Sequence, residues 1–372
     1  MIFLTIFNNK AKMEIVNACK LGDIDEVKTL VSHGKVVPSI AFRTAAENGH
    51  TDIIKYLVET TRERRTNTID ESYCKALCAA SGKGHIHIVE FMTAVIGISE
   101  GSERAMVSAA TNGHLHVLKY LVENINNIYN SHRSVIVAAA GKGYLDIIEY
   151  MLSVADQQRH VLDDALCISS ANGHLAVVKY LAEHGASIYV DNNYCLRMAA
   201  LNGHLDIVKY AVSIGGDPRD NDDWAVRWAA YNGHLEVVRY LVSQGADVSI
   251  YDNYSVCLAA ANGHLEVIRY LKEIGADIHA REDLAVRWAD CNIQYEIIKF
   301  LVDNGAPTTK ISLNGKRYIE FRRKMENMRR IRAQKKIYFW WIQICYDLTR
   351  ACGKRMALRN LDAYNAIVSS YT

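Results

Sequence analysis

Histidines that each follow a glycine are the residues most capable of chemistry in this sequence. Seven of them recur in Asn-Gly-His or Lys-Gly-His: His50, His85, His114, His174, His204, His234 and His264. Histidine is a common metal ligand, so a regular series of this kind raises the question of a metal site. Neighbouring helices pack roughly 8–10 Å apart, whereas zinc–nitrogen bonds are about 2.0–2.1 Å long. Histidines at equivalent places on successive helices therefore cannot share an ion, and we predict no metal site.

Other reactive side chains form no catalytic pattern. His85 and His87, like the pair at 114 and 116, lie two residues apart and do not face each other on a helix. Cys74 and Cys78 can share a helix face, but nothing marks either as a nucleophile, and buried thiols behave as small apolar side chains. Phosphate-loop, nucleophile-elbow and zinc-protease motifs are absent, and the acidic residues are spread along the chain. We therefore predict no enzyme activity, no cofactor and no small-molecule substrate.

The composition predicts a helical protein in a reducing compartment. Of 372 residues, 50% are hydrophobic, 23% are charged and only three are proline. Nine cysteines, an odd number without a Cys-x-x-Cys, argue against a disulfide framework. The opening MIFLTIFNNKAK does not resemble a secretory signal, and no stretch approaches the roughly 18 apolar residues that span a bilayer. We expect a soluble, cytoplasmic protein, with a nuclear location as the alternative.

A ten-residue phrase recurs along the chain and predicts its architecture. Clear copies are NGHLHVLKYL (112–121), NGHLAVVKYL (172–181), NGHLDIVKYA (202–211), NGHLEVVRYL (232–241) and NGHLEVIRYL (262–271). Weaker copies are LGDIDEVKTL (21–30), NGHTDIIKYL (48–57), KGHIHIVEFM (83–92), KGYLDIIEYM (142–151) and NIQYEIIKFL (292–301). From Gly113 to Gly263 the glycine returns every 30 residues. Such a period indicates a repeat protein of about ten units.

Each unit has the apolar spacing of two helices joined at the glycine. Ahead of Gly233, apolar residues lie seven, four and three positions back, which is one face of a helix, and the last two are alanines that permit close approach. After it, Leu235, Val238 and Leu241 recur at intervals of three and mark a second helix. Two helices this short cannot bury their apolar faces alone, so we expect neighbouring units to stack.

The unit A-A-x-N-G-H-L-E-V-V-x-Y-L-x-x-x-G-A-D strongly resembles the ankyrin repeat over residues 12–306. The resemblance implies an all-α, ankyrin-type helical repeat solenoid that binds partner proteins, with the histidines hydrogen-bonded between repeats. The wording of the copies, their period and the basic aromatic tail are most similar to the large ankyrin-repeat families of giant DNA viruses, mimivirus-like. For such a viral protein the expected location is the host cytoplasm.

The chain departs from the ankyrin pattern between repeats. The family repeat has about 33 residues and a T-P-L-H signature, whereas three residues are missing here between Asp252 and Tyr254, and the signature is replaced. The usual binding by long hairpin tips is therefore in doubt, because these hairpins are shortened. We predict that the Asp or Asn just before each first helix replaces the lost hydrogen bonds as an N-cap, namely Asn193, Asp223, Asn253 and Asp283.

Aromatic and arginine side chains replace the signature and define a candidate recognition strip. Its members are Tyr194, Arg197, Trp224, Arg227, Tyr231, Tyr254 and Arg287. Tyrosine, tryptophan and arginine are enriched in binding hot spots, so a protein partner is one interpretation. The other is that these side chains pack against the neighbouring repeat. We expect Trp228 and Trp288 to be half-buried in either case.

The last 66 residues differ in charge from the rest of the chain. Residues 307–372 hold 15 Lys or Arg and four Asp or Glu, whereas residues 1–306 carry net negative charge. A helical stripe begins at Tyr318 and leads to an aromatic cluster. Arg329, Arg330, Phe339, Trp340 and Trp341 are the candidate docking residues of this tail. Four roles remain open: a cap on the last repeat, a partner-docking helix, contact with anionic membranes, and contact with nucleic acid.

These observations together predict three segments and one function. The segments are an N-terminal stretch at 1–11, a solenoid at 12–306 and a basic aromatic helical segment at 307–372. We expect a non-enzymatic scaffold that binds a partner protein through the solenoid surface. The alternative is an adaptor in which the C-terminal segment recruits a host enzyme such as a ubiquitin ligase.

Overall fold

The chain is built from pairs of short antiparallel helices. The computed structural model describes residues 13–63, 69–96, 101–124, 132–154 and 159–347, and these contain helices and no strand. Ten helix pairs follow one another in this part of the chain, and one long helix comes after them. The predicted all-α repeat architecture, a helical repeat solenoid, is therefore confirmed. No helix in the described ranges is long and apolar enough to cross a membrane.

The chain folds as two compact units, residues 1–250 (unit 1) and 251–372 (unit 2). Unit 1 holds a helix at 13–21 and then α2 (Ile24–Ser32), α3 (Ser39–Glu47), α4 (Thr51–Glu63), α5 (Ile69–Lys83), α6 (Ile86–Ile96), α7 (Ser102–Thr111), α8 (Leu115–Asn124), α9 (His132–Lys142), α10 (Leu145–Val154), α11 (Arg159–Asn172), α12 (Leu175–Glu183), α13 (Val190–Leu201), α14 (Leu205–Ser213), α15 (Asp220–Tyr231) and α16 (Leu235–Ser243). Unit 2 comprises α17 (Ile250–Asn262), which begins at the boundary, α18 (Leu265–Glu273), α19 (Ala280–Cys291), α20 (Tyr295–Asp303), a short 3₁₀ turn (Thr308–Lys310) and α21 (Leu313–Asp347).

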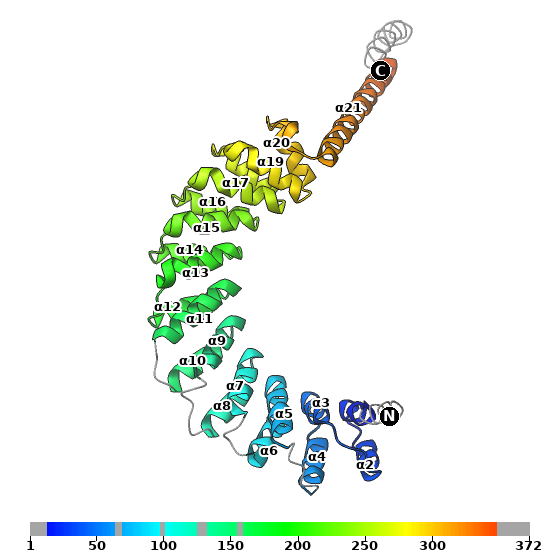
Figure 1. Ribbon diagram of the computed structural model, residues 1–372, viewed down its shortest axis with the longest axis vertical. Coiled ribbons are helices and arrows are strands. Elements are labelled where there is room, and N and C mark those ends of the chain that lie inside the picture. The colour runs from blue at the N-terminus through cyan, green and yellow to red at the C-terminus, as the bar shows by residue number, and fades with distance from the viewer. Residues whose placement is uncertain (1–12, 64–68, 97–100, 125–131, 155–158, 348–372) are drawn as a thin grey trace. The chain divides into compact units, whose positions relative to one another are not determined.

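Within unit 1 the helix pairs stack in two rows (Figure 1). The first helices of successive pairs contact one another from α3 through α5, α7, α9, α11 and α13 to α15, and several second helices do the same, including α12, α14 and α16. The alanine pairs predicted to allow close approach are fully buried between first helices, as at Ala109 with Ala110 and at Ala229 with Ala230. On the second helices, Val237, Val238 and Leu241 bury the apolar face. Burial of small residues in one row and branched ones in the other forms a continuous core.

The turn inside a helix pair packs against a side chain of the next repeat. Gly203 has a φ of +81°, and a Cβ atom added there would lie 2.5 Å from the ring of His234 in the following repeat. That ring fills the space beneath the glycine, and its Nε2–H donates to the carbonyl of Leu201 at 3.0 Å. His174 and His204 bond to the preceding repeat in the same way, at 3.2 and 3.0 Å. The predicted hydrogen bonding of histidines between repeats is therefore confirmed.

The second helices carry a matching ladder of cations on aromatic rings. In unit 1, Lys119 lies 5.4 Å from the Tyr150 ring centre, and the pairs Lys179–Tyr210 and Lys209–Tyr240 repeat the arrangement at 5.7 and 6.0 Å. Each cation belongs to one repeat and its ring to the next. Contacts of this kind are worth about 0.5–1 kcal/mol when exposed, so they add modestly to the apolar stacking.

Candidate functional site

The links between the later repeats contain a short left-handed turn. Three successive residues adopt left-handed backbone angles at each of four links, with φ between 48° and 59° and ψ between 35° and 61°. The segments are 191–193, 221–223, 251–253 and 281–283. Asn and Asp tolerate this region better than other residues, and they fill it entirely in the first two links. The shortened hairpin inferred from the sequence is therefore a strained turn, in which non-glycine residues hold an unfavourable conformation.

Arginine side chains clamp these turns from the following helix. Nε of Arg227 donates to the carbonyl of Asp222 at 2.9 Å, and Nη2 donates to that of Asn221 at 3.2 Å. Arg197 makes the same two bonds to residues 192 and 191, at 2.9 and 2.6 Å. Arg287 makes only one, at 3.1 Å to residue 281. Three arginines of the recognition strip thus have a structural role, because they donate hydrogen bonds to backbone carbonyls of the left-handed turns.

The predicted N-caps are wrong. Asn193, Asp223, Asn253 and Asp283 have positive φ angles, whereas an N-cap residue sits in the extended region. Their side chains bond elsewhere. Asp223 and Asn253 each accept the backbone N–H of the residue 24 positions later, at 2.9 and 3.1 Å, and so tie one link to the next. Asn193 instead donates to the Asp220 carboxylate at 2.6 Å.

The fourth link replaces this bond with a histidine. The residue 24 positions after Asp283 is Pro307, which has no N–H to donate. Asp283 accepts from Nδ1 of His279 at 2.7 Å, and the other ring nitrogen of His279 lies 3.0 Å from the Asn304 carbonyl. Burial is the largest single influence and would lower the pKa of His279, but the hydrogen bonds to Asp283 and the Asn304 carbonyl, with the nearby Asp283 and Asp277 charges, together outweigh it and raise that pKa above its usual range.

The structure brings part of the recognition strip together in unit 1. The Arg197 guanidinium lies over the Tyr194 ring at 5.6 Å and over the Trp224 ring of the next repeat at 5.2 Å. Tyr194 is 37% exposed, whereas Trp224 and Arg197 are half-buried. This set, Tyr194–Arg197–Trp224, is called the aromatic clamp below. It both packs against a neighbouring repeat and remains open to solvent, so the two interpretations of the strip are compatible here.

The other strip residues take part in separate contacts. The Trp228 ring lies 5.2 Å from that of Trp224, tilted against it, and meets the Tyr231 ring edge-on at 5.0 Å, so Tyr231 belongs to a ring cluster in its own repeat. In unit 2, Tyr254 meets Trp288 edge-on at 5.6 Å. Trp228 and Trp288 are half-buried, as predicted.

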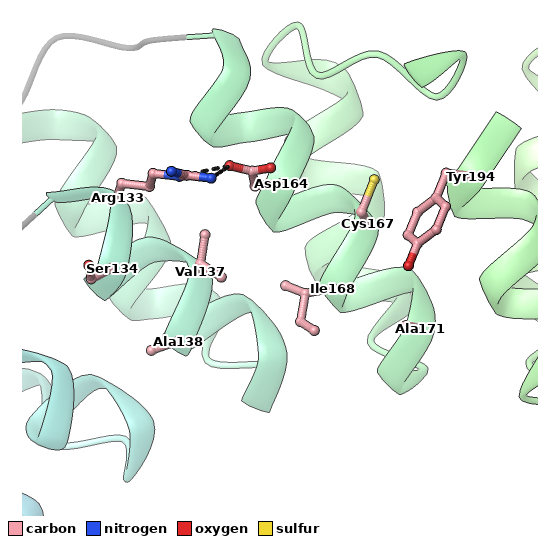
Figure 2. A pocket seen from close by; sticks show the side chains of 9 residues that line it. All are labelled: Arg133, Ser134, Val137, Ala138, Asp164, Cys167, Ile168, Ala171 and Tyr194. Carbon is pink, nitrogen blue, oxygen red and sulfur yellow. Dashed lines mark hydrogen bonds and ion pairs between the residues drawn. The ribbon is translucent and has the colours of Figure 1, made fainter. Parts of the chain in front are cut away.

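A groove opens between the first helices next to the aromatic clamp. Its volume is about 560 Å³, and Arg133, Asp164, Cys167 and Tyr194 are among the residues that line it. Figure 2 shows the ion pair between Arg133 and Asp164, which joins α9 to α11 at 2.7 Å. A second groove of about 450 Å³ lies between α3, α5 and α7, and half of the residues that line it are charged, with both signs present. Both are open surfaces between repeats, and in the described part of the chain no three His, Cys, Asp or Glu side chains gather closely enough to hold a metal ion.

The first part of the basic tail packs on the last repeat. Tyr318 of α21 stacks on Tyr295 at 4.8 Å and donates its hydroxyl to Glu296 at 2.7 Å, and Ile319 is 2% exposed. Ion pairs continue the contact, with Arg323 on Asp303 at 3.1 Å. The capping alternative therefore describes residues 313–326 of the tail.

The next part of α21 makes no such contact. Residues 327–337 are all exposed, including Arg329 and Arg330, and they contain five basic and no acidic residues. Phe339, Trp340 and Trp341 continue the helix, but their side chains lie outside the described residues. The capping role thus ends near residue 326.

Comparison with protein families agrees with this architecture. The family model described as ankyrin repeats (3 copies) matches residues 106–192, 166–252 and 228–312, which together cover more than half of the chain. The chain therefore belongs to the ankyrin-repeat family. No curated protein matches the sequence. Ankyrin repeats indicate a protein–protein interaction module, and proteins built from them are generally non-enzymatic scaffolds.

Sequence reasoning missed the two features that shape this surface. The arginine clamp had a signal, because an arginine stands four residues after an Asn or Asp at 193 and 223 and at 283 as well. The cation–ring ladder also had one, since Lys or Arg precedes Tyr in most copies of the repeated phrase. Neither signal shows by itself which group the cation meets.

Proposed function

We propose that this ankyrin-repeat protein is a non-enzymatic scaffold that binds a partner protein at the aromatic clamp of unit 1. The observation that carries the proposal is the placement of Tyr194, partly exposed, against the Arg197 guanidinium, which two backbone carbonyls already hold. A guanidinium fixed in this way loses little conformational freedom when a partner docks, so less of the binding energy is spent on ordering it. Aromatic residues beside arginine are also the types enriched in binding hot spots.

Affinity purification with matched variants tests this proposal. Tagged full-length chain, Tyr194→Ala and Tyr180→Ala are compared for co-purified proteins by quantitative mass spectrometry. Tyr180 is the control, because it is a partly buried tyrosine of the second-helix row that stacks on His184. We expect Tyr194→Ala alone to lose a partner, with circular dichroism and unfolding midpoint close to those of the parent. Equal partner recovery by all three chains would refute the clamp as the binding site.

A second function, an adaptor that recruits a ubiquitin ligase or another host enzyme through the tail, is favoured by the exposed basic stretch at 327–337. The truncation that tests it ends at residue 326, because residues 313–326 pack on α20 and a cut at 306 would expose that surface. Loss of an enzyme partner with chain 1–326, while other partners remain, would support the adaptor. Full recovery of every partner by chain 1–326 would leave binding to the repeats alone.

A further inference from the structure

Two cysteines of consecutive repeats meet at the wall of the groove in unit 1. The Sγ atoms of Cys167 on α11 and Cys195 on α13 lie 3.1 Å apart. Cys167 is half-buried and lines the groove, where Figure 2 shows it with Tyr194. Cys195 is 2% exposed and is not among the residues that line the groove. One thiol is therefore partly accessible to small solutes, whereas the other is almost fully buried.

Both cysteines occupy positions of the repeat at which other repeats have different residues. Cys167 stands where later repeats have the clamping arginine, as in Arg197 and Arg227. Cys195 stands where later repeats have Ala225 or Ala285. Cys257 shares the position of Cys167, but the residue 28 places after it is Ala285, so it has no thiol at the matching place. Cys257 is also 1% exposed, so it serves as a buried thiol without a partner thiol at the matching position.

We propose that Cys167 and Cys195 form an oxidation-sensitive pair, in which a hydroperoxide modifies Cys167 and Cys195 converts the product into a disulfide between α11 and α13. The Cys167 thiolate attacks the outer oxygen of the hydroperoxide, which breaks the O–O bond and yields a sulfenic acid and an alcohol or water. The Cys195 sulfur then attacks the sulfenic sulfur, the S–O bond breaks, and the hydroxide leaves as water with the Cys195 proton. Two thiols lose two electrons in total, and the hydroperoxide accepts them.

The surroundings assign the two roles. The hydrogen bond with the Cys167 sulfur, and burial after it, raise the pKa of Cys195, so this thiol stays protonated and unreactive toward oxidants in solution. Contact at 3.1 Å places it for attack once Cys167 has been oxidised, because a small approach of the two helices reaches bonding distance. A disulfide here would join the first helices of two repeats beside the groove and restrain their separation.

Peptide mapping of the full chain tests the pair directly. Reduced protein is treated with hydrogen peroxide, its remaining thiols are alkylated under denaturing conditions, and it is digested with trypsin without reductant. Cleavage after Arg159, Lys179 and Arg197 places Cys167 and Cys195 on peptides 160–179 and 180–197. We expect these two peptides to be linked, with the loss of two hydrogen atoms, and to separate with dithiothreitol. The oxidised chain is also expected to unfold at a temperature several degrees above that of the reduced chain.

Variants separate the steps and keep the proposal open to refutation. Cys195→Ala copies the residue of later repeats, and in it we expect a sulfenic acid on Cys167 that dimedone traps. Cys167→Ser is expected to leave Cys195 unmodified, since this thiol is 2% exposed. Cys257 is expected to stay a free thiol under the same treatment. The proposal fails if peptides 160–179 and 180–197 are linked no more often than either is linked to the Cys257 peptide, or if Cys167 oxidises to the sulfinic acid without forming the link.

Discussion

Each later repeat enters the left-handed backbone region at two places, which differ in the residues that adopt it, and in the last repeat Ile293 takes the place of glycine at the inner turn. At the turn inside the repeat, glycine adopts the positive φ and the next repeat's histidine packs against it, as at Gly203 with His234. At the link between repeats, Asn, Asp and even Tyr251 or Arg281 adopt it, and an arginine binds the exposed carbonyls in three of the four links. Glycine adopts the positive φ of the inner turn without steric strain, whereas the non-glycine residues of the link are strained there and hydrogen bonds hold them in place. The strained backbone of these repeats is therefore found in the links between them.

The largest effect is expected from a side chain at the inner turn. Gly203→Ala puts a Cβ atom 2.5 Å from the His234 ring and forces alanine to a φ of +81°. Gly185→Ala is the matched control, because its φ is +96° but nothing lies within 4 Å of the added atom. We expect the control to lose about 1–2 kcal/mol from backbone strain and Gly203→Ala to lose clearly more. Urea unfolding measures both, and equal losses would mean that the histidine ring moves aside at no cost.

The next largest effect is expected from the arginines that bind the turn carbonyls at the links. Arg227→Ala removes two bonds from a charged donor to the turn carbonyls and should cost about 1.5–3 kcal/mol. Arg287→Ala removes only one and should cost less. Arg43→Ala, which loses an exposed pair with Glu47, serves as the control and should cost about 0.5 kcal/mol or less. Unfolding free energies give the order. A loss of stability in Arg227→Ala no greater than that in Arg43→Ala would contradict the role of Arg227 in holding the turn.

A smaller effect of opposite sign is expected inside the strained turn. Glu282 holds a φ of +55° and is exposed, with a distant ion partner in Lys310 at 3.8 Å. Asparagine tolerates left-handed angles better, so Glu282→Asn should stabilise unit 2 by about 0.5 kcal/mol. Glu282→Ala loses the same ion pair without that tolerance and should give no gain. A gain for both variants would point to the lost carboxylate and not to the backbone.

The smallest expected effect is a pH dependence of opposite sign at two histidines. Burial lowers the pKa of His234, so its contribution is intact above the unfolded value and is lost as the pH falls. His279 has a raised pKa, so its contribution is intact below the unfolded value and is lost as the pH rises. Denaturant unfolding of His234→Gln and His279→Gln between about pH 5.5 and 7.5 checks both signs. Glutamine is a fair substitute for His234, because Gln294 fills the equivalent place against Gly263. If the unfolding free energies of parent and variants changed in parallel with pH, neither histidine would contribute to the pH dependence of stability.

The repeat architecture was readable from the sequence because its causes are local and periodic. The glycine, the small pair before it and the branched residues after it recur every 30 residues, and each has one physical explanation. The hydrogen bonding of the histidines between repeats was predicted correctly through the family resemblance.

The links were misread because their conformation depends on the neighbouring repeat. An Asn or Asp before a helix normally predicts an N-cap, yet Asp223 has a φ of +56° and its carboxylate reaches the backbone of residue 247. Nothing at position 223 alone indicates that bond. The hydrogen bonds of Arg197, Arg227 and Arg287 to the turn carbonyls were missed for the same reason, since residue type does not show which carbonyls lie within reach. The binding role of the recognition strip stays a prediction.

The ring that packs on a turn glycine, a histidine at most of these turns, belongs to the repeat that is made later. During synthesis the turn at Gly203 stays open until His234 has left the ribosome, about 30 residues on. At 5–20 residues per second that interval lasts roughly 2–6 s. A turn of this kind therefore acquires its packing partner only after the next repeat has been made, so the last repeat to emerge always has an incomplete inner turn.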